Sequence, residues 1–321
     1  MARPIDGVTA RPDRAVPSRP SSDGPVRGPR RRRLRASLAG WLFVAPALAF
    51  YAAFVLRPIA VTLQYSLYNW DGIGPSTWVG LGNYQRIFTD PDLLDPIIHA
   101  FELIIFFSAI PVVLGLFVAT TIRRIAASRL ATVARTVLFL PQVIPLVAAG
   151  IMWSWLLSTT GMVNQFLGAV GLGSITRAWL GDFSTALPAV GVIGAWVLLG
   201  LCTLLLLAGM SKLDPALFEA ARLDGAGPVR EFFSIILPSL RQEIAVCTTV
   251  TVIAALSSFD IVYISTQGGP GNTTMVPGLQ VFYLAFSERR VGTACALAIA
   301  LMVLVLVTVL PIQWFNREGD E

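Results

Sequence analysis

Few side chains in this sequence of 321 residues could perform catalysis or hold a metal ion. His99 is the single histidine and Lys212 the single lysine. A phosphate-binding GxxxxGK[ST] loop needs a lysine that follows a glycine, but Lys212 follows Ser211, so the sequence predicts no such loop. One histidine cannot build a multi-histidine metal site, and we expect His99 to pair with Glu102 near a helix end. We therefore expect no catalytic residue, no bound metal and no enzymatic activity.

The three cysteines also lack the spacing of a reactive or metal-binding site. Cys202, Cys247 and Cys295 each lie inside an apolar run, and none belongs to a CxxC motif. The sequence therefore predicts neither a disulfide framework nor a zinc site.

Composition indicates that most of the chain lies in a lipid bilayer. Apolar residues make up 55% of the sequence, charged residues 13%, and the mean hydropathy is +0.69, whereas soluble domains carry roughly a quarter charged residues. The net charge of +5 could suggest a nucleic-acid partner, but ten of the 24 basic residues precede Ala36 and the others are scattered. We interpret the charge as a topology signal and expect no nucleic-acid binding.

Six apolar runs are long enough to cross a bilayer as helices, because about 20 residues at about 1.5 Å rise span the hydrocarbon core. The predicted spans are Leu38–Leu56, Ile97–Ile122, Val133–Leu157, Leu187–Met210, Ile244–Thr266 and Gly292–Trp314. The predicted fold class is therefore an all-α, polytopic membrane protein with six transmembrane helices.

The first span allows other interpretations. Ala47 to Ala49 mimic a signal-peptide cleavage site, but the apolar run continues past them, so we favour an uncleaved span. Arg57 is a charge at the outer end if the span stops at Leu56, and an intramembrane arginine if the helix continues to Tyr65. We favour the outer-end interpretation.

The distribution of arginines predicts the orientation, because cytoplasmic flanks carry an excess of Lys and Arg. With the N-terminus inside, the cytoplasmic segments contain 19 of the 24 basic residues. We predict that both termini are cytoplasmic, with a disordered basic tail at 1–33, a membrane domain at 34–316 and a short cytoplasmic tail at 317–321.

The predicted cytoplasmic connection between spans four and five contains the segment EAARLDGAGPVREFFSIILP, residues 219–238. Asp214 and Pro215 supply an N-cap and a first-turn proline, and Asp224-Gly225 supplies a stop. Leu213, Leu217 and Ala221 recur at helical spacing with Phe218 beside them. We predict a short amphipathic helix that ends at this glycine.

A second short helix is predicted from Pro228, until Pro238 breaks or kinks the chain. Its apolar face consists of Val229, Phe232, Phe233 and Ile236. Both helices mix acidic and basic residues, so we expect this hairpin to contact a protein rather than lipid.

The spacing in this hairpin resembles the EAA motif, EAA-x3-G-x9-I-x-LP, of the permease subunits of ABC importers. The residues concerned are Glu219, Ala220, Ala221, Asp224, Gly225, Ile235, Leu237 and Pro238. The resemblance implies that the hairpin is a coupling helix that docks in a cleft of an ATPase subunit, which binds ATP and Mg, while this chain holds no cofactor. The alternative is that Glu219 simply pairs with Arg222 on a solvated helix, an interaction worth about 0.3 to 0.5 kcal/mol.

Other positions resemble carbohydrate permeases, specifically the first permease subunit of maltose- and glycerol-3-phosphate-type systems. They are Arg135-Thr136, Phe139-Leu140-Pro141, Trp153, Trp155, Gly161, Asn164, Phe259-Asp260, Thr266, Gly268-Gly269-Pro270 and Ala285-Phe286. The resemblance covers Leu34 to Asn316 and implies a multi-pass protein of a prokaryotic cell membrane that forms half of a pathway for a sugar or sugar derivative. The implied partners are a second, homologous permease subunit in a heterodimer, two ATPase subunits and an extracytoplasmic solute-binding protein.

Asp260 lies in the predicted fifth span, where an acidic group facing lipid would cost about 2.5 to 3.5 kcal/mol. We expect it to face a water-filled cavity or a partner. By resemblance, Ser257, Ser258, Asp260 and Tyr263 line the sugar path, although hydrogen bonding between helices is a rival role for the serines.

Gly268, Gly269 and Pro270 belong to the predicted outer loop after the fifth span. The resemblance implies that this loop lies near the docked binding protein and takes part in substrate transfer. The alternative is an ordinary turn, because Gly-Gly-Pro is typical of turns.

Alternative functions stay open. Polyamine and amino-acid ABC importers also carry EAA loops. The reason for favouring a carbohydrate substrate is the segment with Phe259-Asp260, Thr266 and Gly268-Gly269-Pro270. An ion-coupled secondary transporter would need a relay inside the spans, for which Asp260 has few companions. The shortage of paired catalytic groups argues against an intramembrane enzyme.

Overall fold

The structure of the protein is a computed structural model that describes residues 41, 43–125 and 128–317. The predictions for the tail at 1–33 and for the terminal residues 318–321 lie outside the described residues. The chain divides into two units, Met1–Arg57 and Pro58–Glu321, and each is described by itself.

The described part of the first unit is helical. Residues 43–51 form an α-helix, and Ala52–Leu56 form a π-helical turn, η1. Helix α2, Arg57–Ser66, follows without interruption, so that the candidate membrane span is Phe43–Ser66. The prediction that this span ends at Leu56 is wrong, because the helix continues through Arg57, as the less favoured interpretation required.

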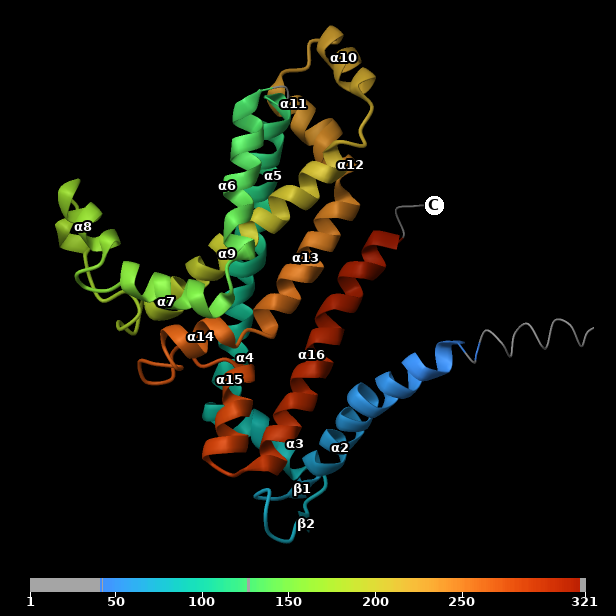
Figure 1. Ribbon diagram of the computed structural model, residues 1–321, viewed down its shortest axis with the longest axis vertical. Coiled ribbons are helices and arrows are strands. Elements are labelled where there is room, and N and C mark those ends of the chain that lie inside the picture. The colour runs from blue at the N-terminus through green and yellow to red at the C-terminus, as the bar shows by residue number, and fades with distance from the viewer. Residues whose placement is uncertain (1–40, 42, 126–127, 318–321) are drawn as a thin grey trace, which may run out of the picture. The chain divides into compact units, whose positions relative to one another are not determined.

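The second unit is dominated by helices, and one short β-hairpin precedes most of them (Figure 1). In this hairpin β1, Tyr68–Asn69, pairs antiparallel with β2, Thr77–Trp78, with Tyr68 opposite Trp78. The elements up to the centre of the chain are α3 Gly82–Thr89, α4 Pro91–Ile104, η2 Ile105–Ala109, α5 Ile110–Arg124, α6 Arg129–Val143, α7 Leu146–Leu156, α8 Met162–Ala169, η3 Gly173–Ile175 and α9 Ala186–Met210. Those after it are α10 Pro215–Leu223, α11 Pro228–Glu231, η4 Phe232–Ile236, α12 Leu237–Ser239, α13 Arg241–Leu256, α14 Asp260–Ser265, α15 Pro277–Phe282, η5 Tyr283–Ser287 and α16 Val291–Arg317.

By length and hydropathy, four helices of the described chain could cross a membrane, or up to six if each of two bent pairs counts as one span. Besides the first span, the unbent ones are Pro91–Arg124, Ala186–Met210 and Val291–Trp314. They correspond to the predicted second, fourth and sixth spans. The polytopic, helical fold class is therefore confirmed at this coarser level.

The predicted third span, Val133–Leu157, is not a straight helix. Helices α6 and α7 meet at an angle of 101°. The break lies at Ile144, whose ψ of 128° is extended, and the following Pro145 precedes α7. Proline disfavours the helical conformation in the residue before it, which accounts for the break.

The predicted fifth span, Ile244–Thr266, is also interrupted. Helix α13 ends at Leu256, and α14 starts only at Asp260. At its other end α13 meets α12 at a break at Leu240, where the chain bends by 70°. Pro238 does not itself break the helix, which continues to Ser239.

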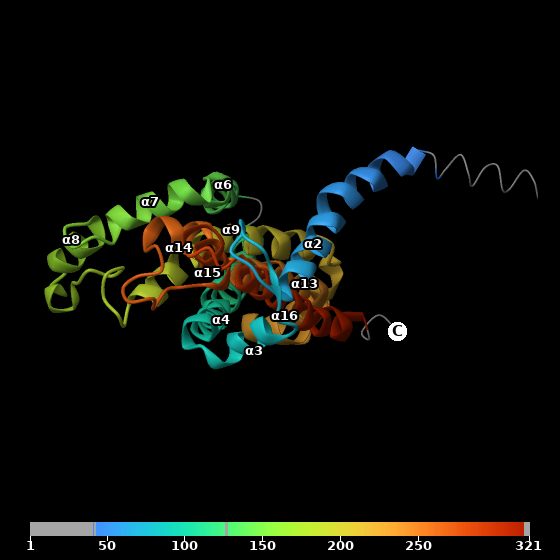
Figure 2. The same cartoon turned by 90° about the horizontal axis from the view of Figure 1, so that it is seen from below.

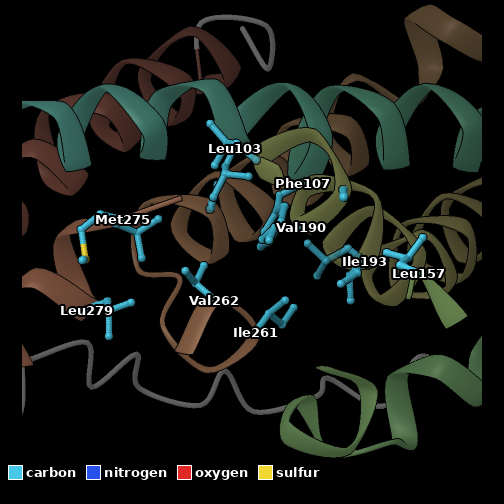
Figure 3. Close-up of a cluster of buried hydrophobic side chains, with 14 residues drawn as sticks. Leu103, Phe107, Leu157, Val190, Ile193, Ile261, Val262, Met275 and Leu279 are labelled. Carbon is cyan, nitrogen blue, oxygen red and sulfur yellow. The ribbon is translucent and has the colours of Figure 1, made fainter. Parts of the chain in front are cut away.

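Helix α9 runs through the centre of the second unit and packs against α5, α6 and α13 (Figure 1). At Gly200 the helices approach so closely that a Cβ atom would overlap the carbonyl oxygen of Leu138 on α6. Figure 3 shows the main apolar cluster, in which α9 meets α4, α14 and α15. Its labelled members are Leu103, Phe107, Leu157, Val190, Ile193, Ile261, Val262, Met275 and Leu279.

The elements that carry the predicted site residues lie apart in the second unit. Helix α10 is at one end of the long axis, whereas α14 and α15 lie well toward the other end (Figure 1). Helices α7 and α8 extend to one side of the other helices in both views (Figure 2). The sequence motifs thus form two separate candidate regions.

Candidate functional site

Helix α10 begins where the sequence predicts. The Oδ1 atom of Asp214 accepts a hydrogen bond from the amide of Ala216 at 2.9 Å, and Pro215 occupies the first turn. The cap supplies an acceptor for one of the amides that a helix start leaves without a partner, and the proline removes another. The predicted N-cap is confirmed.

The same helix buries one aromatic side chain and leaves the motif residues near the surface. Phe218 is 4% exposed, whereas Glu219 and Ala220 are exposed and Ala221 is half-buried. Leu217, predicted beside Phe218 on the apolar face, is 51% exposed. None of the ion pairs in the described part of the chain involves Glu219, so its carboxylate is free to meet a partner.

The turn after α10 is a Schellman arrangement centred on Gly225. Its φ of +76° is a left-handed conformation that glycine adopts without steric cost. The amide of Gly225 donates to the carbonyl of Arg222 at 3.0 Å, and the amide of Ala226 donates to that of Ala221 at 2.9 Å. Asp224 is the C-cap, and both Asp224 and Gly225 are exposed. The predicted glycine stop is confirmed.

The second arm contains the remaining motif residues and runs from α11 through η4 to α12. Ile236 is 1% exposed, Ile235 and Leu237 are half-buried, and Pro238 is exposed. Ile236 and Phe218 share an apolar cluster with side chains of α5, α9 and α13. The hairpin is thus attached to three of the long helices.

The apolar face predicted for the second arm is confirmed for Phe232 and Ile236, which pack in this cluster, and is wrong for Val229 and Phe233. Val229 and Phe233 are 70% and 60% exposed, whereas the acidic Glu231 is 6% exposed. A π-turn contains an extra residue, which rotates the side chains that follow relative to a regular α-helix. The helical period used for the prediction therefore fails at Phe233, which lies inside this turn, whereas Val229 and Glu231 precede the turn.

Two arginines hold the hairpin together. Arg222 pairs with Glu231 across the turn, with an Nε–Oε1 distance of 3.0 Å. This pair replaces the alternative Glu219–Arg222 interaction. The guanidinium carbon of Arg123, at the end of α5, lies 3.5 Å from the centre of the Phe218 ring, a cation–π contact.

The predicted path residues lie where the fifth span breaks. A cavity of about 190 Å³ lies between α9, η2, the start of α7 and the α13–α14 connection. Ser257, Ser258 and Asp260 line it, but Tyr263 does not. Tyr263 instead stacks on Phe259, with ring centroids 5.3 Å apart. Three of the four predicted path residues thus converge on one cavity.

The polar groups of this cavity have few internal partners. Ser258 is 7% exposed, and its buried Oγ atom has no hydrogen-bond partner in the structure. The rival role for this serine, a hydrogen bond between helices, is therefore not observed. Ser257 and Asp260 are exposed, and most of the remaining wall is apolar.

The Gly268–Pro270 loop has a defined internal structure. Gly268 has φ +90°, and the Gly269–Pro270 bond is cis. The hydroxyl of Thr274 donates to the carbonyl of Gly269 at 2.8 Å.

The ring nitrogen Nδ1 of His99 lies 2.9 Å from the carbonyl oxygen of Met275, so His99 links α4 to this loop, instead of forming the predicted pair with Glu102.

Comparison with known proteins places these regions in a family. Residues 111–318, which include the hairpin and every residue that lines the cavity except Phe107, match the family described as "Binding-protein-dependent transport system inner membrane component". The chain belongs to this family.

Curated members are similar over most of their length. The probable ABC transporter permease protein YurN of Bacillus subtilis is 33% identical over 88% of this chain and 97% of the relative. The diacetylchitobiose uptake system permease protein NgcF of Streptomyces coelicolor is 31% identical over 90% and 86%. The lactose transport system permease protein LacF of Rhizobium radiobacter is 30% identical over 88% and 94%.

Solved structures share the fold. A chain of a bacterial ABC transporter involved in the import of the acidic polysaccharide alginate matches with a TM-score of 0.77 and 23% identity, over 90% of this chain and all of that chain. A chain of the alginate transporter in complex with a periplasmic protein bound to alginate pentasaccharide gives the same TM-score with 21% identity, over 90% and 98%.

Family membership confirms the predicted permease class. The protein is a membrane component of a binding-protein-dependent transport system and not an enzyme. This class argues against the alternative of a secondary transporter that works alone.

Sequence reasoning missed the residues that attach the hairpin to the helices. Arg123 entered the prediction only as one of the cytoplasmic basic residues, and Glu231 was not part of the predicted apolar face. No local pattern identifies the Arg123–Phe218 contact, since the two residues are far apart in the sequence. The helical period also could not find the buried Glu231, because its burial accompanies an ion pair with Arg222 of the other arm.

Proposed function

We propose that this family member is the permease subunit of an ABC importer and forms half of a translocation pathway for a sugar or sugar derivative delivered by an extracytoplasmic binding protein. The names of several relatives support a carbohydrate substrate. They are described as permeases for diacetylchitobiose, for lactose and for starch degradation products, the last from Thermoanaerobacterium thermosulfurigenes. The segment from Phe259-Asp260 to Gly268-Gly269-Pro270 also favours a carbohydrate substrate.

The proposed topology is that of a prokaryotic cell-membrane protein with six transmembrane helices and both termini in the cytoplasm. The arginine distribution and the count of up to six candidate spans support it. The coupling hairpin then lies on the cytoplasmic side between the fourth and fifth spans.

The single observation that carries the proposal is the hairpin, which combines an exposed tip with a buried base. Glu219, Ala220, Asp224 and Gly225 are exposed, whereas Phe218 packs among the long helices. Such an element can bind a partner and transmit its movement to the spans. We assign the EAA residues of both arms to docking on one of the two ATPase subunits, which bind ATP and Mg.

The proposed sugar path includes Ser257, Ser258 and Asp260. Their cavity of about 190 Å³ is smaller than the roughly 300 to 1,000 Å³ of ligand pockets. A second, homologous permease subunit would complete it by forming the opposite wall in a heterodimer. Tyr263 supports this wall by stacking on Phe259. The Gly268–Pro270 loop then lies at the outer mouth, near the docked binding protein.

The test is uptake into proteoliposomes that contain this chain, its partner permease, the ATPases and the binding protein. We expect ATP inside the vesicles to drive uptake of radiolabelled lactose, maltose or diacetylchitobiose, but not of spermidine or glutamate. Uptake of spermidine or glutamate alone would overturn the carbohydrate assignment. Uptake driven by an ion gradient without the ATPases would overturn the coupling mechanism.

A further inference from the structure

A second cavity lies at the hairpin end of the helices, apart from the proposed sugar path. It has a volume of about 380 Å³ and lies between α5, α6 and the last turns of α9. Two arginines, Arg123 of α5 and Arg135 of α6, are among its lining residues. The other lining residues come from α9 and are Leu204, Leu207, Ala208, Met210 and Ser211. The cavity thus combines two cations with an apolar wall.

The positive charge in this cavity has no directly paired acid in the described part of the chain, and the nearest acid acting on Arg123 is Glu231. Neither Arg123 nor Arg135 takes part in an ion pair there. Glu231, in the second arm of the hairpin, already pairs with Arg222 at 3.0 Å. The cavity therefore has unbalanced charge that an anion could neutralise.

Arg135 supplies a second, independent indication that this cavity binds an anion. Its Nε atom is buried and has no hydrogen-bond acceptor in the structure. Buried donors in native proteins almost always have a partner, either protein or ordered solvent. Arginine also prefers the paired oxygens of a phosphate or carboxylate, which its planar donors can bind in parallel.

The apolar wall favours a phosphate that is attached to a lipid. Leu204, Leu207 and Met210 offer no hydrogen-bonding groups to a free, fully hydrated anion, but they can pack against an acyl chain or glycerol backbone. The arginines lie where a headgroup would be, since α5 and α9 both end here and both belong to candidate spans. Basic pockets between transmembrane helices are typical sites for anionic headgroups.

We propose that the Arg123–Arg135 cavity binds an anionic phospholipid, with the phosphate on the two guanidinium groups and the lipid's apolar part along α9. Because Arg123 also contacts Phe218, the bound lipid would adjoin the base of the hairpin. This site is independent of the substrate and needs only the membrane location that the family shows.

The experiment is native mass spectrometry of the full-length protein, extracted with its associated subunits and titrated with phosphatidylglycerol or phosphatidylcholine. We expect phosphatidylglycerol adducts in excess of phosphatidylcholine adducts. Arg135→Gln should lower the apparent affinity for phosphatidylglycerol at least about tenfold, because a charged bidentate contact is lost. The matched control is Arg129→Gln, an exposed arginine on the same helix outside the cavity lining, which should bind as the unmodified protein does.

Two further measurements identify the ligand and keep the test valid if a variant misfolds. Ala208→Trp fills the cavity without removing charge and should also lower phosphatidylglycerol binding, so it tests the site if Arg135→Gln does not accumulate. Inorganic phosphate at millimolar concentration should not displace the lipid. Equal binding of both lipids, unchanged binding in Arg135→Gln and Ala208→Trp, or displacement by inorganic phosphate would each overturn the proposal, the last in favour of a free-anion site.

Discussion

Gly225 is the residue on which the hairpin turn depends. Its φ of +76° is open to glycine and, at some cost, to asparagine, but closed to proline, which is fixed near −65°. The space around the missing Cβ atom is empty, so the constraint is on backbone conformation and not on side-chain volume. Substitutions at Gly225 therefore separate the shape of the hairpin from its packing.

We predict that Gly225→Pro abolishes uptake and releases the ATPase while the protein still inserts in the membrane, because the turn lies outside every candidate span. The measurements are copurification of the ATPase and transport of radiolabelled sugar. Gly225→Asn is the matched control and should retain ATPase binding, since asparagine tolerates the left-handed conformation. Normal transport by Gly225→Pro would refute the coupling role.

At the cavity, Asp260 is the residue with the largest expected effect on transport. It is an exposed carboxylate beside the unpartnered hydroxyl group of Ser258. We predict that Asp260→Asn lowers uptake about tenfold or more while leaving ATPase copurification unchanged, because a charged acceptor for sugar hydroxyls becomes neutral. Asp95→Asn, outside the cavity lining, is the control. Equal uptake in the two variants would remove Asp260 from the path.

In the proposed coupling the element that transmits movement is α10, and its buried attachment is the Phe218 side chain. This ring is 4% exposed and lies under Arg123 and among the side chains of the second apolar cluster. The neighbouring Leu217 is 51% exposed. One helix thus offers a buried and an exposed apolar residue at adjacent positions.

Truncation of these two side chains should have unequal effects. Phe218→Ala should cost about 3 to 5 kcal/mol of local stability, as removal of a buried aromatic ring does. Leu217→Ala, the matched control, should change it by less than about 0.5 kcal/mol if no partner is bound. Hydrogen exchange of the α10 amides measures both. Equal exchange rates in the two variants would show that Phe218 does not hold the hairpin.

At the same scale, prolines explain what the sequence could and could not predict. The start of α10 and its stop at Gly225 were predictable because caps and glycine turns act locally. Three π-turns, η1, η2 and η4, each end two residues before a proline, namely Pro58, Pro111 and Pro238. In each of these turns, the backbone amide of the residue before the proline donates a hydrogen bond to the carbonyl oxygen five residues earlier in the chain. These wider turns let the helices accommodate proline and continue.

The consequence is that local rules failed at these positions. The helix end predicted near Pro58 is absent, the bend predicted at Pro238 lies at Leu240 instead, and two residues of the apolar face of the second arm are exposed. The interruption at residues 257–259 was also invisible, because Leu256, Ser257 and Phe259 fit an apolar run without a glycine or proline. The cavity that these residues line results from packing against α7 and α9, which no single segment encodes.

For the whole molecule, the proposed orientation makes the hairpin and the Gly268–Pro270 loop face opposite sides of the membrane. Their separation along the long axis of the second unit is consistent with this arrangement (Figure 1). Arg230 and Asn272 are both exposed and lie in the two regions. The native cysteines Cys202 and Cys247 are buried, which limits background reaction.

We predict that, in intact cells, a membrane-impermeant maleimide labels Asn272→Cys but not Arg230→Cys, because only the outer loop is accessible. Permeabilised cells should label both. The unmodified protein measures the background from Cys295, which is half-buried. Labelling of Arg230→Cys in intact cells would place the hairpin outside and invalidate the proposed coupling.

The attachment of one short hairpin to α5, α9 and α13 together has a consequence for the transport cycle. A displacement of α10 cannot be absorbed by a single neighbour, because Phe218 and Ile236 share their packing with all three helices. If the proposed ATPase displaces α10, the displacement is therefore shared by the three helices. We expect them to move in one concerted step, without long-lived conformers in which only one helix has moved.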